Sequence, residues 1–189
     1  MTERETLELY EKTGALMHGH FRLTSGLHSD VYLQSALVLQ HPPHAAALGA
    51  ALAEPFRAER ATTVLAPAIG GILVAHEVAR ALGIRALFTE RENGVMRLRR
   101  GFTLEPGERC LVVEDVITTG GSTREVVACV EAAGGTVIGV GSLIDRSGGT
   151  AAFTVRHVAL ASVEAATWDP AECQLCREGG QAIKPGSRA

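Results

Sequence analysis

The amino-acid sequence predicts an α/β fold, in which a central, mainly parallel sheet is covered by helices on both faces. Three observations support this prediction. Short apolar runs alternate with helical patterns of ten or more residues, turn residues separate them, and no internal repeat or long linker divides the 189 residues. Strands that alternate with helices pair in parallel, because each helix returns the chain to the same edge of the sheet. A chain of this length can bury a core of its own.

The N-terminal part precedes this alternation. Residues 3–16 have the apolar spacing of an amphipathic helix, 18–30 are polar and rich in turn residues, and 31–39 form a short apolar run. Residues 44–60 are rich in alanine and predict a helix whose last turn is disturbed by Pro55.

The alternating pattern then predicts strands at 63–66, 84–88, 109–113, 136–144 and 155–163, and helices at 70–82 and 122–133. Gly83 is expected to end the first of these helices. The stretch 90–107 is polar, rich in arginine and poorly periodic, so we expect a long loop or a flexible hairpin there.

Composition excludes several classes of protein. A formal net charge of -3 gives no sign of a nucleic-acid or anionic-membrane partner. Residues 1–11 are polar and acidic, unlike a signal peptide, and a cytoplasmic location is the expectation. Cys110 and Cys129 fall in a predicted strand and helix, where thiols are commonly buried and inert, so a disulfide scaffold is not expected.

The segment 110–123 carries the clearest chemical signal. A strand ends in Glu114 and Asp115, and small glycine and hydroxyl residues then lead into a helix. Backbone N–H groups of such a loop, together with the helix N-terminus, bind phosphate. The two acids suit the cis hydroxyls of a ribose, directly or through Mg²⁺. Ser122 and Glu125 have the spacing of a capping box, and the Gly-Lys-Ser/Thr ending of a Walker loop is absent.

The plainer alternative for this segment is a strand–turn–helix corner with ordinary capping residues. Paired acids followed by six small loop residues are hard to explain in that way. On these residues the chain resembles the type I phosphoribosyltransferases, and the resemblance extends over roughly residues 15–165.

The resemblance implies the type I phosphoribosyltransferase fold with a small N-terminal hood. It divides a single domain, 1–189, into the hood and N-terminal helix (about 1–40), a core (about 44–165) and a tail (about 166–189). It implies Mg²⁺ as cofactor and 5-phosphoribosyl-1-pyrophosphate (PRPP) as substrate. The PRPP-binding residues would be Glu114, Asp115, Val116, Ile117, Thr118, Thr119, Gly120, Gly121, Ser122 and Thr123. In this scheme the two acids hold the ribose hydroxyls and are counted as catalytic.

Two further segments resemble those of orotate phosphoribosyltransferases. Residues 21–32 match the hood motif Phe-x-Leu-x-Ser-Gly-x-x-Ser, and Asp145-Arg146 follows a predicted strand. An arginine suits the carboxylate of orotate, because guanidinium donates two parallel hydrogen bonds to it. The implied orotate-binding residues are Thr118, Arg146, Ser25, Gly26 and Tyr32. Each segment also has a plainer interpretation. The first could be a generic surface turn, and the second could simply cap the end of a strand.

The arginine-rich stretch is the third such segment. Four arginines and one glutamate give residues 91–100 a net charge of +3, which suits a pyrophosphate leaving group. The resemblance makes this the catalytic loop that reaches into the neighbouring subunit of a homodimer. Its catalytic residues would be Arg91, Arg97, Arg99 and Arg100. A merely solvated loop is the alternative.

The chain also departs from the family pattern. Thr24 stands where a lysine is common, the segment 66–71 lacks the usual lysine, and the Lys-Asp-His of the mobile loop is missing. Arginines could replace these lysines in charge but not in geometry.

The implied reaction converts orotate and PRPP to orotidine 5′-phosphate and pyrophosphate, a pentosyl transfer in the de novo synthesis of UMP. Two alternatives remain: a purine phosphoribosyltransferase, and a regulator that senses PRPP without catalysis. A DNA-binding regulator should carry a basic helical region, and none is visible.

The tail contains a Cys-x-x-Cys pair, Cys173 and Cys176. The pair could form half of a zinc site, act as a redox pair, or simply pack. Zinc needs four ligands and the chain has no second Cys-x-x-Cys, so His157 or a symmetry mate would have to complete the site. Lys184 and Arg188 could add positive charge near the substrate.

Overall fold

The computed structural model describes residues 1–23 and 25–185. Thr24 and Arg188, for which the sequence suggested roles, lie outside the described residues. None of the helices in the described ranges is long and apolar enough to cross a membrane.

The core is built on a six-stranded sheet with the order β5-β4-β3-β6-β7-β8. All neighbouring strands pair in parallel except β4 and β5, which are antiparallel. The strands are β3 (Thr63–Pro67), β4 (Arg85–Glu92), β5 (Val95–Leu98), β6 (Arg109–Ile117), β7 (Thr136–Asp145) and β8 (His157–Ser162).

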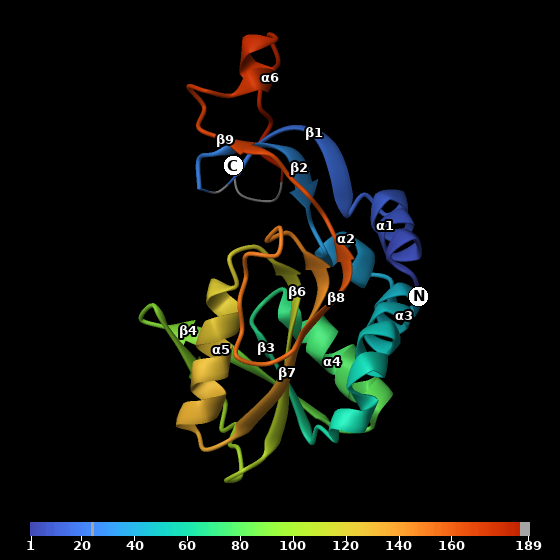
Figure 1. Ribbon diagram of the computed structural model, residues 1–189, viewed down its shortest axis with the longest axis vertical. Coiled ribbons are helices and arrows are strands. Elements are labelled where there is room, and N and C mark those ends of the chain that lie inside the picture. Colours follow the sequence, from blue (N-terminus) through green and yellow to red (C-terminus); the bar gives the residue numbers. More distant parts are fainter. Residues whose placement is uncertain (24, 186–189) are drawn as a thin grey trace.

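Helices cover both faces of this sheet (Figure 1). The helices α3 (Pro42–Ala53) and α4 (Gly71–Leu82) pack on one face, and α5 (Gly121–Ala132) packs on the other. Side chains alternate between the two faces along a strand, and β3 shows this directly. Val64 and Ala66 belong to the core under α3 and α4, whereas Leu65 belongs to the core under α5. The predicted α/β class is therefore confirmed.

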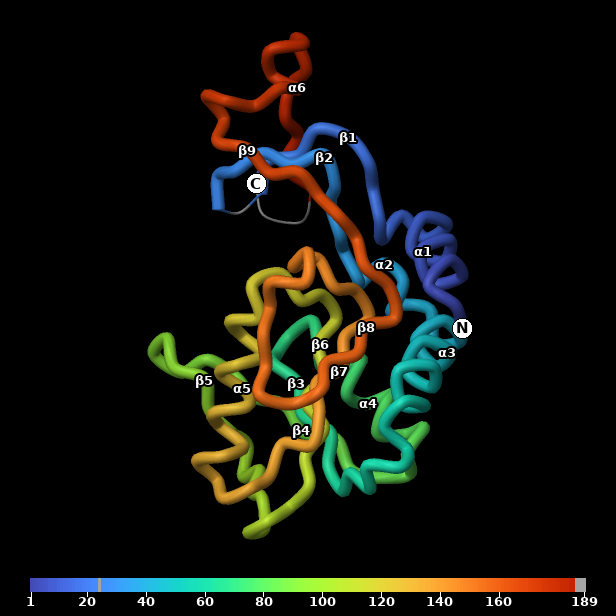
Figure 2. The backbone as a smooth tube through the Cα atoms, viewed as in Figure 1, coloured from blue at the N-terminus to red at the C-terminus, as the bar shows by residue number. Residues whose placement is uncertain are grey.

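A second, smaller sheet forms the hood. It has the order β1-β2-β9, from β1 (Leu16–Arg22), β2 (His28–Leu33) and β9 (Thr167–Trp168). Figure 2 shows this sheet at one end of the molecule, beyond the carboxyl ends of the core strands, with α6 (Gln174–Arg177) beside it. The C-terminal segment thus belongs to the hood in space, which its position in the sequence did not reveal. The chain reaches the hood from α1 (Glu3–Lys12) and leaves it through α2 (Ala36–Leu39).

Most of the predicted core elements are confirmed. Pro55 disturbs the end of α3 as expected. The α-helix stops at Ala53, and the chain continues as a 3₁₀ turn over Glu54–Glu59. Gly83 ends α4 in the left-handed conformation, with φ 73°. Three boundaries were wrong. The first helix ends at Lys12 and not at residue 16, and β4 continues past residue 88 to Glu92. β6 continues past residue 113 to Ile117, because pairing with β7 continues beyond the acids. Glu114 and Asp115 therefore lie within the strand and do not follow it.

For the stretch 90–107 the sequence predicted either a long loop or a flexible hairpin, and its first part forms a hairpin. Strands β4 and β5 are joined by Asn93 and Gly94, whose φ angles are 52° and 81°. Asn-Gly is the strongest short signal for a two-residue hairpin turn with both central residues at positive φ. That signal was present in the sequence and could have placed the turn.

Candidate active site

The phosphate loop lies at the carboxyl edge of the sheet. Residues 118–120 connect β6 to α5, so the N-terminus of a twelve-residue helix faces the loop. Gly120 begins this helix at φ 74°, and a Cβ there would lie 2.9 Å from Nη1 of Arg124 and 3.0 Å from the ring of Phe153. Glycine is therefore required at this position both by backbone conformation and by space.

The predicted capping box at Ser122 and Glu125 is wrong. Gly120 is the N-cap, no side chain caps the helix, and Ser122 already lies inside it. Glu125 pairs instead with Arg91 across the hairpin, with 2.7 Å between Oε2 and Nη1. Oγ1 of Thr119 accepts a hydrogen bond from the N–H of Gly121 at 3.4 Å, and in the described residues the N–H groups of Ser122 and Thr123 have no side-chain acceptor, in the manner of an anion-binding helix end.

Glu114 and Asp115 are both held in a largely desolvated part of the site. Burial raises the pKa of Glu114 to about 7, although its side chain accepts a hydrogen bond from Thr123. Burial also raises the pKa of Asp115, and a hydrogen bond from Ser35 opposes that shift. Oη of Tyr10 donates to Oγ of Ser35 at 3.2 Å, so the N-terminal helix supports the same cluster. No motif in the sequence marked Ser35 or Tyr10 as part of this site.

Gly70 brings a second loop against the acids. A Cβ at Gly70 would lie 2.7 Å from Oδ1 of Asp115, so only glycine allows this approach. The backbone between β3 and α4 is thereby placed next to the acidic pair.

The acidic pair has the donor chemistry of a Mg²⁺ site. Carboxylate oxygens are the hard ligands that Mg²⁺ takes, together with substrate phosphates. The ion pairs found in residues 1–23 and 25–185 do not include Glu114 or Asp115. Two half-buried carboxylates that pair with no cationic side chain in the described residues fit a bound metal ion or the hydroxyls of a sugar.

Arg146 lies at the same edge of the sheet, just after β7. Its backbone N–H donates to the carbonyl oxygen of Ile117 at 2.8 Å, which puts it beside Thr118 at the start of the phosphate loop. Its Nη2 donates to Oγ of Ser29 in the hood at 2.9 Å. Burial lowers the pKa of Arg146, and the nearby charge of Asp30 opposes that shift. The guanidinium thus links the core to the hood.

Three of the other predicted base-binding residues belong to the hood, whereas Thr118 lies in the phosphate loop. Ser25 and Gly26 are exposed in the turn between β1 and β2, and Gly26 has φ 89°. Tyr32 is half-buried in β2, where its ring packs 5.7 Å from that of Phe21. Ser29, rather than these three, makes the hydrogen bond to Arg146.

Comparisons with known proteins agree with this geometry. A model of the phosphoribosyl transferase domain matches residues 35–164. The chain is 56% identical to an orotate phosphoribosyltransferase of Pelotomaculum thermopropionicum, over 100% of this chain and 99% of that protein. It is 53% identical to one of Heliobacterium modesticaldum over 100% of both chains.

The chain belongs to the orotate phosphoribosyltransferase family.

Solved structures of this family show the same fold. The orotate phosphoribosyltransferase of Aeropyrum pernix is 28% identical, with TM-score 0.67 over 82% of this chain and 92% of that chain. That of Mycobacterium tuberculosis is 26% identical, with TM-score 0.70 over 84% of this chain and 97% of that chain. Adenine phosphoribosyltransferases also match, but at 18–19% identity they show the fold alone. The predicted type I phosphoribosyltransferase fold is confirmed.

The arginines that the family resemblance made catalytic lie on or next to the β4–β5 hairpin. All four are exposed and paired with acids of the same chain. Arg91 pairs with Glu125, both Arg97 and Arg99 approach Glu92 (3.7 and 3.3 Å), and Arg100 donates two hydrogen bonds of 2.8 Å to Glu90. In this arrangement four arginines share three carboxylates of the same subunit, which offset most but not all of their charge.

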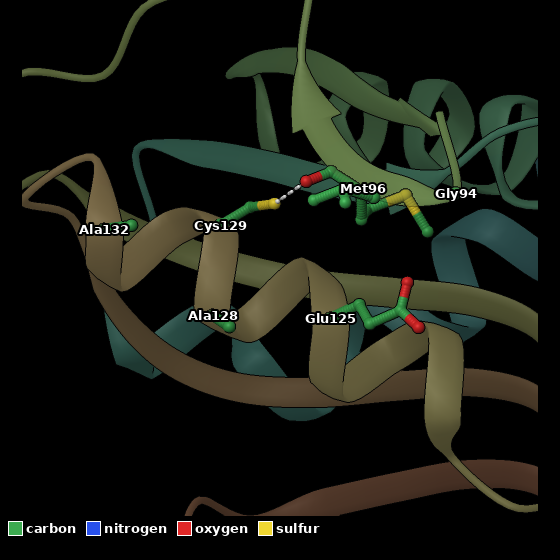
Figure 3. Close-up of a pocket in the computed structure, with 7 residues that line it drawn as sticks. Gly94, Met96, Glu125, Ala128, Cys129 and Ala132 are labelled. Carbon is green, nitrogen blue, oxygen red and sulfur yellow. Dashed lines mark hydrogen bonds between the residues drawn. The ribbon is translucent and has the colours of Figure 1, made fainter. Parts of the chain in front are cut away.

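A groove of about 430 Å³ separates the hairpin from α5 (Figure 3). Its lining is mostly apolar, and Sγ of Cys129 in it donates to the carbonyl oxygen of Met96 at 3.0 Å. The lining residues are Gly94, Val95, Met96, Glu125, Ala128, Cys129 and Ala132. The groove therefore lies apart from the acidic pair and from Arg146.

The prediction that His157 completes a zinc site with the tail cysteines is wrong. His157 is in β8 of the core sheet, where its Nε2 lies 3.1 Å from Oγ of Ser142. The tail cysteines instead meet two other histidines, His20 and His28, of the hood.

Proposed function

We propose that this chain transfers the phosphoribosyl group of PRPP to orotate, producing orotidine 5′-phosphate and pyrophosphate in the presence of Mg²⁺. The observation that carries the proposal is the position of Arg146. A half-buried guanidinium faces the hood at the same edge of the sheet as a phosphate loop and a half-buried acidic pair. Relatives that are 50–56% identical over the whole chain bear the name of this activity.

The 5-phosphate would bind the loop 118–123, where the N-terminus of α5 supplies N–H donors and a partial positive charge. Glu114 and Asp115 would bind the ribose hydroxyls or the metal ion. A bound Mg²⁺ would neutralise part of the charge on pyrophosphate. The transition state of such a transfer resembles an oxocarbenium ion, so the protein contributes mainly positioning and electrostatic stabilisation.

The base would be recognised by its carboxylate. Arg146 is fixed from two sides, by the hydrogen bond to Ser29 and by the charge of Asp30. A guanidinium that is already oriented loses little conformational freedom when it binds a carboxylate. A neutral purine carries no carboxylate with which this arginine could form an ion pair.

The hairpin arginines would act on pyrophosphate in the site of a neighbouring subunit, so we propose a homodimer. The tip of the hairpin projects from the body of the molecule beside α5 (Figure 1). Closure over the site would exclude water, which would otherwise hydrolyse the activated ribosyl group. We further propose that the reaction serves pyrimidine synthesis in the cytoplasm.

The test compares orotate with uracil as substrate for the wild type and for Arg146→Ala. Losing a bidentate, charge-assisted pair should lower kcat/KM for orotate by about thirty-fold to a thousand-fold, or roughly 2–4 kcal/mol. Uracil lacks the carboxylate, so its low efficiency should change much less. Arg4→Ala, on the exposed side of α1, is the control arginine. An unchanged ratio of orotate to uracil efficiency, or faster consumption of adenine or hypoxanthine than of orotate, would overturn the proposal.

A further inference from the structure

Four metal-binding side chains converge where the C-terminal segment meets the hood. They are His20 of β1, His28 of β2, and Cys173 and Cys176 at α6, and their ligand atoms all lie within 4.8 Å of one another. Cys173 and His28 are buried, and the other two are half-buried. The two pairs are about 150 positions apart in sequence, so the tertiary fold alone brings them together.

The distances fit a tetrahedral zinc ion. Zn–S bonds of about 2.3 Å and Zn–N bonds of about 2.0–2.1 Å place neighbouring ligand atoms roughly 3.3–3.8 Å apart. Nε2 of His20 lies 3.4 Å from Sγ of Cys173 and 3.7 Å from Sγ of Cys176. Nδ1 of His28 lies 3.3 Å from Sγ of Cys176 and 2.9 Å from Nε2 of His20. The N–N distance is about 0.4 Å shorter than a tetrahedron requires, and the three N–S distances lie within about 0.3 Å of the roughly 3.6 Å that it gives for such a pair.

Hydrogen bonding alone does not account for this arrangement. Three polar atoms surround Nε2 of His20, yet a ring nitrogen can take part in one strong hydrogen bond as donor or acceptor. Nδ1 of the same ring is buried and has no hydrogen-bond partner in the described part of the chain. The polar contacts of this ring therefore all converge on one point, which a metal ion would occupy.

The C-terminal segment also lacks a hydrophobic anchor. Between residues 164 and 185, Cys173 is the single buried residue, and α6 has only four residues. The backbone contacts that hold the segment are few: β9 pairs with β2 over two residues, and Ile183 exchanges two hydrogen bonds with β1. Small units without an adequate core commonly depend on a metal or a disulfide for stability.

We propose that His20, His28, Cys173 and Cys176 bind one Zn²⁺ ion, which fastens the C-terminal segment to the β1–β2 hairpin. With four protein ligands the coordination shell is closed, as in structural zinc sites. Ser29, which binds Arg146, directly follows the ligand His28. The ion would therefore hold the hood sheet in the position from which it contacts the core.

The metal content of the full-length protein, purified with reductant from zinc-supplemented medium, is the first measurement. We expect about one zinc per chain. Exchange with Co²⁺ should give the intense visible bands of tetrahedral cobalt and a near-ultraviolet thiolate-to-cobalt charge-transfer band. Both readouts are independent of enzyme activity.

Variants then locate the site. Cys176→Ser and His28→Ala should each lose zinc and the cobalt spectrum. Cys129→Ser, a half-buried thiol elsewhere, and His18→Ala, an exposed histidine on the same strand as His20, should retain both. Should the ligand variants fail to fold, a chelator can be added to the wild type while hydrogen exchange is followed. Exchange should then accelerate over 16–33 and 164–185 and stay unchanged in β3 and β6.

Several outcomes would overturn the proposal. The first is a reduced wild type that contains no zinc and gives no tetrahedral cobalt spectrum. The second is that Cys176→Ser and His28→Ala retain both. The third is that hydrogen exchange in the hood does not change after chelation. A Cys173–Cys176 disulfide in protein purified with reductant would favour a redox pair instead.

Discussion

At the scale of single residues, the site depends on placing two carboxylates where water is scarce. Glu114 and Asp115 both have raised pKa values because burial disfavours their charged forms. Free carboxylates in such a place destabilise the fold, and a bound cation or hydroxyl would remove that cost. The unfavourable electrostatics of the free protein thus indicate where ligand binding can be strong.

The pKa of Glu114 predicts a pH dependence of stability. It is about 7 in the folded protein against 4.5 ordinarily, so the folded state binds the proton more tightly than the unfolded state. Proton binding stabilises the fold fully below pH 4.5, and this contribution is lost as the pH rises to about 7. Glu114→Gln should therefore become more stable than the wild type across that range, by about 1–3 kcal/mol at pH 8 without ligand.

Urea unfolding at several pH values, without Mg²⁺ or PRPP, checks this prediction. Glu131→Gln, at an exposed position of α5, is the control substitution. A constant difference between Glu114→Gln and the wild type from pH 5 to pH 8 would contradict the assigned pKa.

Gly70 gives a second prediction at this scale. Replacement by alanine puts a Cβ within 2.7–3.0 Å of the carboxylate of Asp115, which must then move. We expect Gly70→Ala to lower kcat/KM for PRPP at least ten-fold, as Asp115→Asn should do more severely. Leu73→Ala, at an exposed position of the same helix, serves as the control in a steady-state assay. Near-normal PRPP efficiency in Gly70→Ala would show that the position of Asp115 is not critical.

At the scale of elements, the tip of the β4–β5 hairpin is held to α5 by a weak ion pair. The pair of Arg91 and Glu125 is nearly half exposed at both side chains, and such pairs contribute about 1 kcal/mol or less. The tip can therefore shift at little cost, whereas Met96 of β5, which is buried in the core with Val126 and Val130 of α5, holds the rest of the hairpin in place.

Arg91→Ala tests whether this arginine acts on the substrate. Because the ion pair is weak, Tm should fall by no more than about 4 °C. We expect kcat/KM for PRPP to fall at least ten-fold. Glu125→Gln is a matched control, since it breaks the same ion pair but keeps the arginine, and it should remain near wild-type activity. If both variants lost activity equally, the ion pair and not the arginine charge would be responsible.

At the scale of the whole molecule, the hairpin arginines could serve their own site or a neighbour's. If they serve a neighbour's, mixing inactive Asp115→Asn subunits with inactive Arg99→Ala subunits should partly restore activity. Each hybrid dimer would then contain one intact site. Activity should be measured after subunit exchange has been confirmed by mass spectrometry, and failure to recover it would place the loop in its own subunit.

The sequence by itself determined the core and the chemistry of its main loop. Alternation of apolar strands with amphipathic helices is local information, since each face of β3 or β6 is set by neighbouring residues. The loop 118–123 and the acids before it are contiguous, so their common role was also predictable. The start of α5 was misassigned because Ser122 and Glu125 have the spacing of a capping box. The helix begins instead at Gly120, whose positive φ is visible only in the three-dimensional structure.

Tertiary structure alone decided which distant residues meet. The approach of Gly70 to Asp115, the bond from Arg146 to Ser29 and the cluster of His20 and His28 with the tail cysteines all join separate segments. No periodicity encodes such contacts, because they depend on the order of strands and on the path of the chain over the sheet. For the same reason His157 was a plausible ligand in the sequence, although its strand lies in the core sheet and not in the hood.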